Sequence, residues 1–391
     1  MRIGLAGLGA ASTEIINALK KNGNVSLTAG CDVRAELRDA FVEREGGLAF
    51  ESVEAMAASG AVDVVYVATP NHLHCDHVVA AASAGKDVIV EKPMALTLAE
   101  CDRMIEAAKT HGTRLLAGHT HSFDAPVVAM RRAIDDGLIG DVYMINQWYY
   151  TDWLYRGRLP DELDVGKGGG VVYRQGPHGL DIIRLLADRP VRRVKAFTTS
   201  LDFRGPTHGS YTALIEFDGA VHSTVVFSGY SFFDTAELTF GLGELGCPRP
   251  SETNGRARAF IRELSARDGE EDYKRSVAYG GAEASKWQSV VMHCEDDVRK
   301  HPFYGLTVVS GSRGDMRQSP DGLYIYDDEG RRELLIGKEV LEREAEINIL
   351  YEAWRDDVPL AAHDGSWARD TLELVLAIIE SAESGVEVRV S

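Results

Sequence analysis

The first 120 residues alternate short apolar runs with helical patterns, and this alternation constrains the fold more than any other feature of the sequence. Nearly all-apolar strands separated by helices are typical of a parallel sheet that is covered on both faces. Right-handed crossovers between such strands give a doubly wound Rossmann domain, expected over residues 1–122. Its strands are predicted at 2–6, 25–31, 62–69, 87–90 and 113–118, and its helices at 13–20, 35–43, 75–84 and 98–110.

The pattern changes after residue 122, where strand signals dominate and the dipeptide Asp218-Gly219 indicates a hairpin turn. Residues 123–391 are therefore predicted to form an α+β domain with an open, mostly antiparallel sheet. A polar stretch at 247–287 is expected to be an irregular insertion. The C-terminal helix, over 366–384, is a candidate to pack back on the Rossmann domain. The other elements expected are a helix at 124–136, strands at 142–150, 194–201, 211–217, 221–227, 236–240, 306–310 and 323–326, and a helix at 340–355.

A glycine-rich turn follows the first strand and opens the first helix. In such a turn the first glycine, Gly7, permits a tight bend, and the second, Gly9, lets the backbone approach a pyrophosphate. The helix start, at Ala10, Ala11 and Ser12, supplies unpaired N–H groups and the positive end of the helix dipole. The third motif position is usually Gly or Ala, and Ser12 is still small enough for close packing. The pattern predicts a dinucleotide site.

An acidic residue stands at the end of the second strand, 20 residues after Ser12. A carboxylate there accepts hydrogen bonds from the adenosine ribose, and it repels a 2′-phosphate. Asp32 therefore favours NAD over NADP. Arg34, two residues further on, is a possible partner for a 2′-phosphate, so NADP stays possible.

Charge and cysteine content exclude several classes of protein. The chain has 42 basic and 60 acidic residues, a formal net charge of −18, which is unfavourable for nucleic-acid or membrane partners. Five widely spaced cysteines without a C-x-x-C pair argue against a disulfide scaffold or a zinc ribbon and for a reducing compartment. The N-terminus runs straight into a strand pattern, so no signal peptide is expected, and a cytoplasmic location is predicted.

Further motifs at strand ends resemble one known family. Thr69-Pro70-Asn71-His72-Leu73-His74 stands at the end of the strand predicted at 62–69, and Glu91-Lys92-Pro93 follows the strand predicted at 87–90. A third stretch contains Gly168-Gly169-Gly170, then Gly176, His178 and Asp181. In this order the motifs resemble those of the glucose–fructose oxidoreductase and inositol dehydrogenase family (Gfo/Idh/MocA). The resemblance covers nearly the whole chain.

The resemblance implies an oxidoreductase whose nicotinamide lies in a cleft between a Rossmann domain and an open-sheet domain. Lys92 would be the active-site lysine, Pro93 a cis proline that orients it, and His178 the acid/base histidine. The family commonly forms oligomers through the face of that sheet, so a homodimer or homotetramer is expected. The residues implied to line the cofactor are Thr69, Pro70, Asn71, His74, Glu91, Lys92 and Pro93.

One position departs from the family pattern. Four residues before His178, where many members carry Asp, this chain has Arg174. Arginine is well shaped to hold a carboxylate in a bidentate pair, so the substrate is expected to be an anionic ring rather than a neutral sugar. The stretch 148–158 interleaves aromatic residues with arginines, which suits a flat anionic ring. The segments 121–126, 151–153, 174–176 and 308–326 resemble the branch that oxidises carboxylated cis-dihydrodiols, as phthalate and chlorobenzoate dihydrodiol dehydrogenases do. Arg174, Arg156, Trp153 and Asp181 are the candidate substrate-binding residues.

Several alternatives remain open at this level. The sequence does not determine whether Lys92 or His178 accepts the proton, because a desolvated lysine is also a base. A sugar, inositol or glycoside dehydrogenase is the nearest rival function. A nucleotide-sensing regulator has no need of this acid/base pair, and a lyase or epimerase that recycles its cofactor would retain NAD(H) on purification. His72, His74, Cys75 and His77 lack a second ligand group with zinc-like spacing, so no metal is expected.

Overall fold

The computed structural model describes residues 1–9, 11–118, 120–230, 232–267, 269–284, 294, 298–337 and 343–390. The chain divides into two compact units. The first unit comprises Met1–His119, Lys274–Trp287 and Glu342–Leu372. The second unit comprises Thr120–Tyr273, Gln288–Leu341 and Glu373–Ser391.

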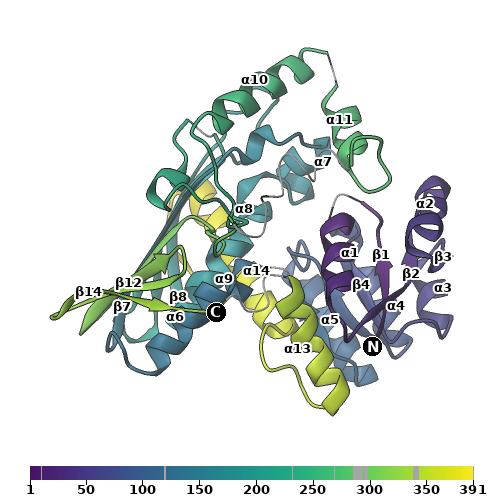
Figure 1. The fold of residues 1–391 in the computed structure, drawn as a ribbon, viewed down its shortest axis with the longest axis horizontal. Coiled ribbons are helices and arrows are strands. Elements are labelled where there is room, and N and C mark those ends of the chain that lie inside the picture. The colour runs from purple at the N-terminus through teal and green to yellow at the C-terminus, as the bar shows by residue number, and fades with distance from the viewer. Residues whose placement is uncertain are drawn as a thin grey trace. The chain divides into compact units, whose positions relative to one another are not determined.

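The first unit is built on a parallel sheet (Figure 1). Strands β4 and β5 are buried along their whole length, which shows that both faces of the sheet are covered, as the apolar runs predict. The short strand β3 was not expected from the sequence, because only three residues carry it. In spatial order the described strands are β3 (Leu48–Phe50), β2 (Ser26–Cys31), β1 (Arg2–Ala6), β4 (Val64–Val67), β5 (Asp87–Val90) and β6 (Leu115–Ala117).

Helices of the first unit come from both ends of the chain. Helix α13 packs against α1, although more than 300 residues separate them in sequence. The start of α14 also belongs here, since Arg369 forms an ion pair with Asp102 at 2.7 Å and Gly365 lies against Leu115. The described helices are α1 (Ser12–Lys21), α2 (Ala35–Glu45), α3 (Val53–Ala58), α4 (His74–Ser83), α5 (Leu98–His111), α13 (Arg343–Asp356) and the N-terminal part of α14 (Gly365–Ser384).

The second unit contains a large mixed sheet in which β7 and β10 are parallel and the other described pairs are antiparallel. The predicted α+β architecture is therefore confirmed. In spatial order the described strands are β14 (Gly330–Leu335), β13 (Gly322–Asp327), β12 (Gly314–Ser319), β11 (Leu306–Gly311), β7 (Val142–Tyr150), β10 (His222–Ser228), β9 (Ser210–Phe217), β8 (Val191–Thr199) and β15 (Val388–Arg389).

The central strands of this sheet alternate between buried and exposed residues. Ile145 and Tyr149 of β7 are buried on the face that helix α9 contacts, whereas Trp148 points to the opposite face and is 45% exposed. Leu214 of β9 is likewise 55% exposed. The helices of this unit are α6 (Ala125–Asp135), α7 (Pro160–Leu163), α8 (Gly170–Arg174), α9 (Gly176–Ala187), α10 (Thr253–Ser265), most of α14, and α11 (Glu270–Val277), which runs into the first unit.

Three local expectations differ from the structure. Residues 236–240 lie in and after a 3₁₀ helix, Thr235–Leu238, instead of a strand, and Phe240 has a φ of +60° that a strand does not allow. The stretch expected to be irregular contains helices α10 and α11. A disulfide joins Cys247 to Cys294, a pair that wide spacing alone does not reveal. Residue 268 and residues 285–287 of that stretch lie outside the described residues.

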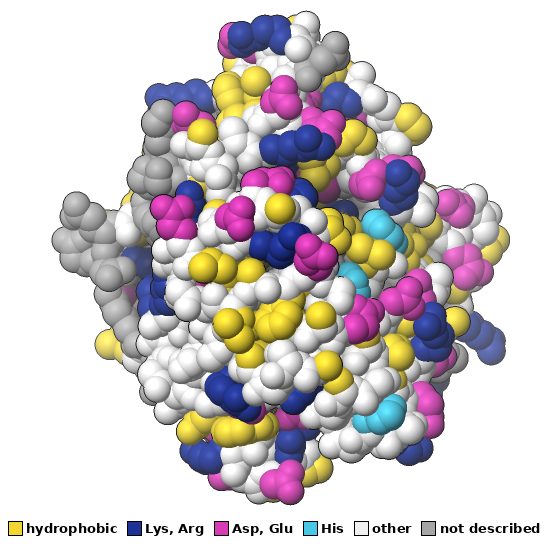
Figure 2. All heavy atoms as spheres, turned by 90° about the vertical axis from the view of Figure 1, so that its right-hand side faces the viewer, with side chains coloured by type: hydrophobic (Ala, Val, Ile, Leu, Met, Phe, Trp, Pro, Cys, Tyr) yellow, Lys and Arg dark blue, Asp and Glu magenta, His cyan; other side chains and the backbone are white. Residues whose placement is uncertain are grey.

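The surface carries charges of both signs. On the face drawn in Figure 2, basic side chains lie beside acidic ones, although the chain has a net charge of −18. A search of the described helices finds none with the length and apolar character needed to cross a lipid bilayer.

Candidate active site

The glycine turn after β1 has the geometry that a dinucleotide requires. Gly7 has a φ of +91°, and a Cβ added there would lie 2.6 Å from the carbonyl oxygen of Ala68, so only glycine fits. A Cβ added at Gly9 would meet no atom within 4 Å, which leaves the backbone open to a pyrophosphate. Ser12 is buried at the start of α1, where its hydroxyl donates to the Gly7 carbonyl at 2.8 Å. Ala11 directly precedes α1, and Ala10 lies outside the described residues.

Asp32 ties the end of β2 to this turn. Its carboxylate accepts the backbone N–H of Leu8 at 2.9 Å and forms a two-pronged pair with the Arg34 guanidinium at 3.0 and 3.1 Å. Burial raises the pKa of Asp32, but the hydrogen bonds from Arg34 and Leu8 outweigh it and leave the pKa below its usual value. An ionised carboxylate therefore stands where the sequence predicts the ribose contact.

The turn after β4 carries several of the predicted cofactor residues. Asn71 is buried in a 3₁₀ helix, Asn71–Leu73, whereas Pro70 before it is exposed. Thr69 shares a hydrogen bond with His77 at 2.9 Å. His74 is completely buried, and its ring nitrogens contact the Thr69 carbonyl at 2.8 Å and the Pro93 carbonyl at 3.1 Å. His74 therefore connects the turn after β4 to the turn after β5. Its contact with the cofactor stays a prediction.

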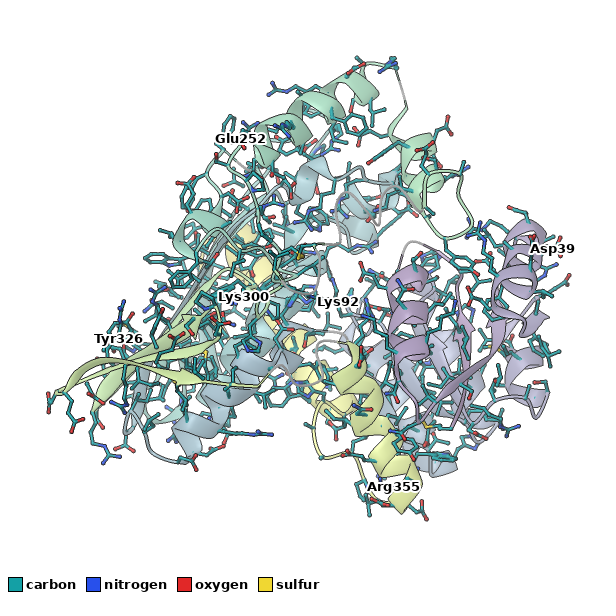
Figure 3. All side chains as sticks on the ribbon, in the orientation of Figure 1. Asp39, Lys92, Glu252, Lys300, Tyr326 and Arg355 are labelled. Atoms are coloured by element: carbon teal, nitrogen blue, oxygen red, sulfur yellow. A yellow bond between two sulfur atoms is a disulfide. The ribbon has the colours of Figure 1, made fainter. Side chains whose placement is uncertain are left out.

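Lys92 is the second residue after β5 and is half-buried (labelled in Figure 3). The Lys92–Pro93 peptide is cis, as the family resemblance implies. Glu91 is buried, its N–H donates to the Val67 carbonyl at 2.9 Å, and its carboxylate is paired with Arg343. The backbone on either side of Lys92 is therefore fixed to neighbouring elements of the first unit.

In the second unit, the rings of His178, His121 and Tyr304 pack together. This histidine lies in the first turn of α9 and is 7% exposed. Its ring centroid is 4.9 Å from that of His121 and 5.0 Å from that of Tyr304, and the His121 and Tyr304 rings stack at 4.6 Å. His121 is bonded through Nδ1 to the buried Asp124 at 2.8 Å, and burial holds the pKa of this carboxyl above its usual value.

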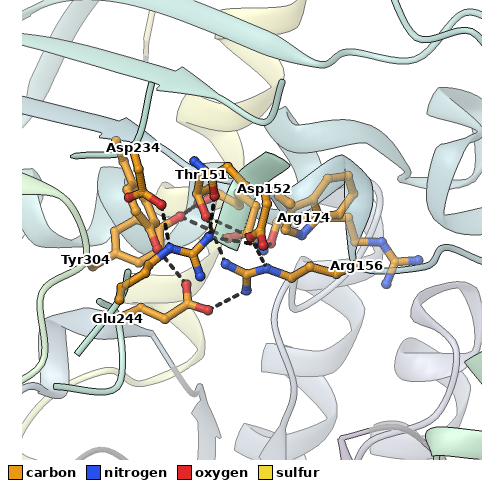
Figure 4. Close-up of polar contacts among 12 residues, drawn as sticks. Thr151, Asp152, Arg156, Arg174, Asp234, Glu244 and Tyr304 are labelled. Atoms are coloured by element: carbon orange, nitrogen blue, oxygen red, sulfur yellow. Dashed lines mark hydrogen bonds and ion pairs between the residues drawn. The ribbon is translucent and has the colours of Figure 1, made fainter. Parts of the chain in front are cut away.

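A charged network lies beside these rings (Figure 4). Arg156 donates to Asp152 at 2.7 Å and to Glu244, whose other oxygen accepts the Tyr149 hydroxyl at 2.8 Å. Burial raises the pKa of Glu244. Arg156 and the nearby His121 lower it by more than burial raises it, so the pKa falls to about 2. Arg249 completes the network, as it pairs with Asp152 at 3.0 Å and with Asp234. Two guanidinium groups thus pair with three carboxylates.

The predicted substrate-binding residues lie in different surroundings. Arg174 ends α8, and its Nε donates to the Gly168 carbonyl at 3.1 Å. Trp153 is buried under the guanidinium of Arg158, which lies 3.9 Å from the indole centroid. Asp181 is buried and accepts the hydroxyls of Thr120 and Ser122, both at 2.5 Å. Arg156 is held by the carboxylates of the network described above. Substrate contacts for these four side chains remain predictions.

Most members of the charged network could not be identified from the sequence. Glu244 and Arg249 come from the segment after β10, and no motif or spacing links them to the site. Arg156 is the exception, because the stretch 148–158 with its aromatic residues and arginines makes it a candidate substrate-binding residue. Tyr304 precedes β11 and is identified only by its contacts.

A parallel sheet with an open glycine turn and an ionised acid at the next strand end defines a dinucleotide-binding domain. Comparison with known families agrees. Residues 1–119 match the model of the oxidoreductase family with an NAD-binding Rossmann fold, Gfo/Idh/MocA, and residues 127–240 match the C-terminal domain of the same family. The chain belongs to the Gfo/Idh/MocA family and is an NAD-dependent dehydrogenase.

Two similar proteins cover nearly the whole chain. A 1-carboxy-3-chloro-3,4-dihydroxycyclohexa-1,5-diene dehydrogenase from Comamonas testosteroni is 33% identical over 384 residues, 98% of this chain and 95% of that protein. A crystal structure of a protein assigned as a dehydrogenase, from Bordetella bronchiseptica RB50, has a TM-score of 0.92 and 36% identity, and covers 100% of this chain and 99% of its own.

A third relative matches only part of the chain. It is an inositol 2-dehydrogenase/D-chiro-inositol 3-dehydrogenase from Lactiplantibacillus plantarum, 28% identical over 201 residues, 50% of this chain and 55% of that protein.

Proposed function

We propose that this dehydrogenase oxidises a carbinol of a carboxylated cyclic cis-dihydrodiol with NAD. The observation that carries the proposal is the 33% identity, over 98% of the chain, to a dehydrogenase whose substrate is a ring carboxylic acid with two vicinal hydroxyls. Arg174 supports it from the sequence, because a guanidinium replaces the carboxylate that many sugar-oxidising members carry.

Alcohol oxidation needs a hydride acceptor and a base for the hydroxyl proton. NAD, when bound, supplies the hydride acceptor. An unperturbed imidazole titrates near neutral pH, so His178 is assigned to take the proton, and Lys92 is assigned to stabilise the developing charge on the substrate oxygen. We treat the two as one acid/base unit, since a lysine in an apolar setting also accepts a proton.

Arg174 is proposed as the clamp for the ring carboxylate. Its Nε is anchored on the Gly168 carbonyl, which fixes the plane of the guanidinium. Burial lowers the pKa of Arg174, while Glu162 and Asp161 raise it, and an arginine stays charged throughout the working pH range. A two-pronged pair with a carboxylate would decide which carbinol hydrogen faces the nicotinamide.

The other predicted substrate residues receive supporting roles. Arg156 is assigned to the framework, because it already pairs with Asp152 and Glu244. Trp153 and Asp181 are proposed to shape the site wall from buried positions. Oxidation of such a diol yields a hydroxydienone, which tautomerises to a catechol, and the aromatic product makes the reaction favourable in that direction.

A second candidate is oxidation of a neutral polyol. The inositol dehydrogenase that matches half of this chain favours it. The two functions differ in the charge of the substrate, so Arg174 discriminates between them. With a polyol, Arg174 has no carboxylate to hold, and its removal would change turnover little.

Substitution of the proposed residues tests the proposal. We expect Lys92→Ala and His178→Ala each to lower kcat by about 100-fold or more, the usual range for loss of an acid/base group. Arg174→Ala should lower kcat/KM for carboxylated diols by about 100-fold and for neutral diols by about twofold. Arg174→Lys, which keeps the charge but not the planar fork, should lie between. Equal losses on acidic and neutral diols would disprove the clamp.

We further propose that a second copy of the chain covers the open face of the sheet. Trp148, Phe197 and Leu214 are 45%, 63% and 55% exposed, which is unusual for large apolar side chains on central strands. Sedimentation should give a dimer or tetramer mass, and Leu214→Glu should lower it. A monomer mass for the unmodified protein would rule this assembly out.

A further inference from the structure

A buried polar cluster joins the end of β5 to helix α13 within the first unit. It consists of Tyr66 on β4, Glu91 after β5, and Arg343 and Glu346 on the first turn of α13. Arg343 donates to the Tyr66 hydroxyl at 2.7 Å and to the Glu91 carboxylate, and the Tyr66 hydroxyl donates to Glu346. Tyr66 and Glu346 are completely buried, and the side chain of Arg343 is 13% exposed.

The cluster contains one tight ion pair. Burial raises the pKa of Glu346 to about 8, so this carboxyl is protonated at neutral pH. Burial works against the charge of Arg343, but Glu91 and Tyr66 outweigh it and hold the pKa well above the usual value. The other carboxylate near Arg343 is Glu14, at 3.6 Å and half-exposed. Glu91 is therefore the main counter-charge of a buried arginine.

Glu91 is also the residue before Lys92. Its N–H is bonded to β4, and its carboxylate is fixed by Arg343. On the other side of Lys92, the Pro93 carbonyl contacts His74 at 3.1 Å, and burial lowers the pKa of that imidazole although Glu91 raises it. Arg343 and His74 thus fix the residues before and after the lysine. A shift of Glu91 would move the Lys92 backbone and expose the lysine to an unpaired carboxylate.

We propose that Arg343 is a positioning residue for Lys92, acting through its ion pair with Glu91. Helix α13 thereby contributes to the active site without touching substrate. The inference rests on the proposed role of Lys92 in catalysis. It goes beyond that role because it assigns a task to an arginine more than 250 residues away in sequence.

The test measures the pKa of Lys92 directly. Full-length enzyme with saturating NAD is reductively methylated with ¹³C-formaldehyde, and the Lys92 dimethylamine signal is identified as the one absent from Lys92→Arg. Its pKa is then measured by NMR titration. The variants are Arg343→Met, Arg343→Lys, Glu91→Gln and the double variant Arg343→Met/Glu91→Gln. Arg355→Met is the matched control, because Arg355 lies at the far end of α13, is exposed and pairs with Asp356 (Figure 3).

Removal of Arg343 should raise the pKa of Lys92 by about one unit, the low end of the effect of a nearby opposite charge. The double variant should bring it back towards the original value, because the unpaired carboxylate is gone. With a working substrate, Arg343→Met should lower kcat about tenfold with KM changed less than about twofold, and Arg343→Lys should recover part of the loss. Arg355→Met should change neither quantity.

A structural role alone gives a different result. It predicts a lower unfolding midpoint for Arg343→Met with an unchanged Lys92 pKa and unchanged kcat per folded molecule, and that result would overturn the proposal. If Lys92→Arg keeps full turnover but the pKa of Lys92 still rises in Arg343→Met, the coupling stands and the proposed catalytic role of Lys92 fails. The two failures are therefore distinguishable.

Discussion

The imidazole of His121 lies 4.9 Å from that of His178 and is bonded to the buried carboxyl of Asp124. A carboxylate–imidazole pair therefore stands next to the proposed acid/base histidine. His121 also contributes to the lowered pKa of Glu244. Tyr304 stacks on His121 and fixes the spacing of the rings.

The first prediction concerns Asp124. Asp124→Asn keeps the shape of the side chain but removes the charge beside His121, so we expect kcat to fall about tenfold with little change in KM. Asp135→Asn is the control, because Asp135 is an exposed residue at the end of α6, the helix that Asp124 precedes, and it pairs with Arg131. Steady-state kinetics across pH 5–9 checks this, and an unchanged pH profile would rule out a role for Asp124 in the proton transfer.

The second prediction concerns cofactor choice. Asp32→Ser removes the carboxylate that opposes a 2′-phosphate and releases Arg34 from its ion pair. We expect KM for NAD to rise about 10- to 100-fold, which corresponds to one charge-assisted hydrogen bond, and KM for NADP to fall. Glu51→Gln, in an exposed pair with Arg38, should change neither value. A variant that still strongly prefers NAD would show that Asp32 does not set the choice.

The third prediction separates two glycines of the same turn. Gly9→Ala adds a methyl group that meets no protein atom within 4 Å, so the unfolding midpoint should hold while NAD affinity falls at least about tenfold. Gly7→Ala places a Cβ 2.6 Å from the Ala68 oxygen at positive φ, so it should lose stability as well. Nucleotide titration and thermal unfolding measure both effects. Unchanged NAD affinity in Gly9→Ala would place the pyrophosphate elsewhere.

The fourth prediction concerns stability in acid. Glu244 has a pKa of about 2 in the folded protein, below its ordinary value near 4.5, so it stabilises the fold above pH 4.5 and loses this effect as pH falls through 2. Glu244→Gln leaves Arg156 with one carboxylate fewer, and we expect a loss of about 2–3 kcal/mol at pH 7. Urea unfolding at pH 7 and pH 3 measures this. A difference as large at pH 3 as at pH 7 would mean that the charge of Glu244 is not responsible.

The sequence predicts the parallel sheet well because its strands are buried on both faces. An apolar run such as 64–67 is too short for a buried helix and too uniformly apolar for a strand with one face in water. The glycine turn and Asp32 are predicted because their spacing is local. The short strand Leu48–Phe50 and the helix Val53–Ala58 lack such a pattern, since neither is long enough to show a period.

The charged network could not be predicted, because it depends on tertiary contact. Arg156 reaches Glu244 across 88 residues of sequence, and Arg343 reaches Glu91 across 252. A charged residue considered alone is most simply interpreted as exposed. The sequence therefore makes Arg156 a candidate to bind the substrate. The structure shows that carboxylates of the same unit pair with Arg156, and its contact with a substrate stays a prediction.

The central claim is that this enzyme oxidises a carboxylated cyclic cis-dihydrodiol with NAD. Its most direct test is NADH formation by the purified protein, followed by absorbance, with a carboxylated cis-dihydrodiol, the same diol without the carboxylate, and myo-inositol at equal concentrations. We predict that kcat/KM for the carboxylated diol exceeds that for the other two by about 100-fold or more, as expected when the half-buried guanidinium of Arg174 holds the carboxylate. Faster turnover of myo-inositol, or equal turnover of the two diols, would contradict it.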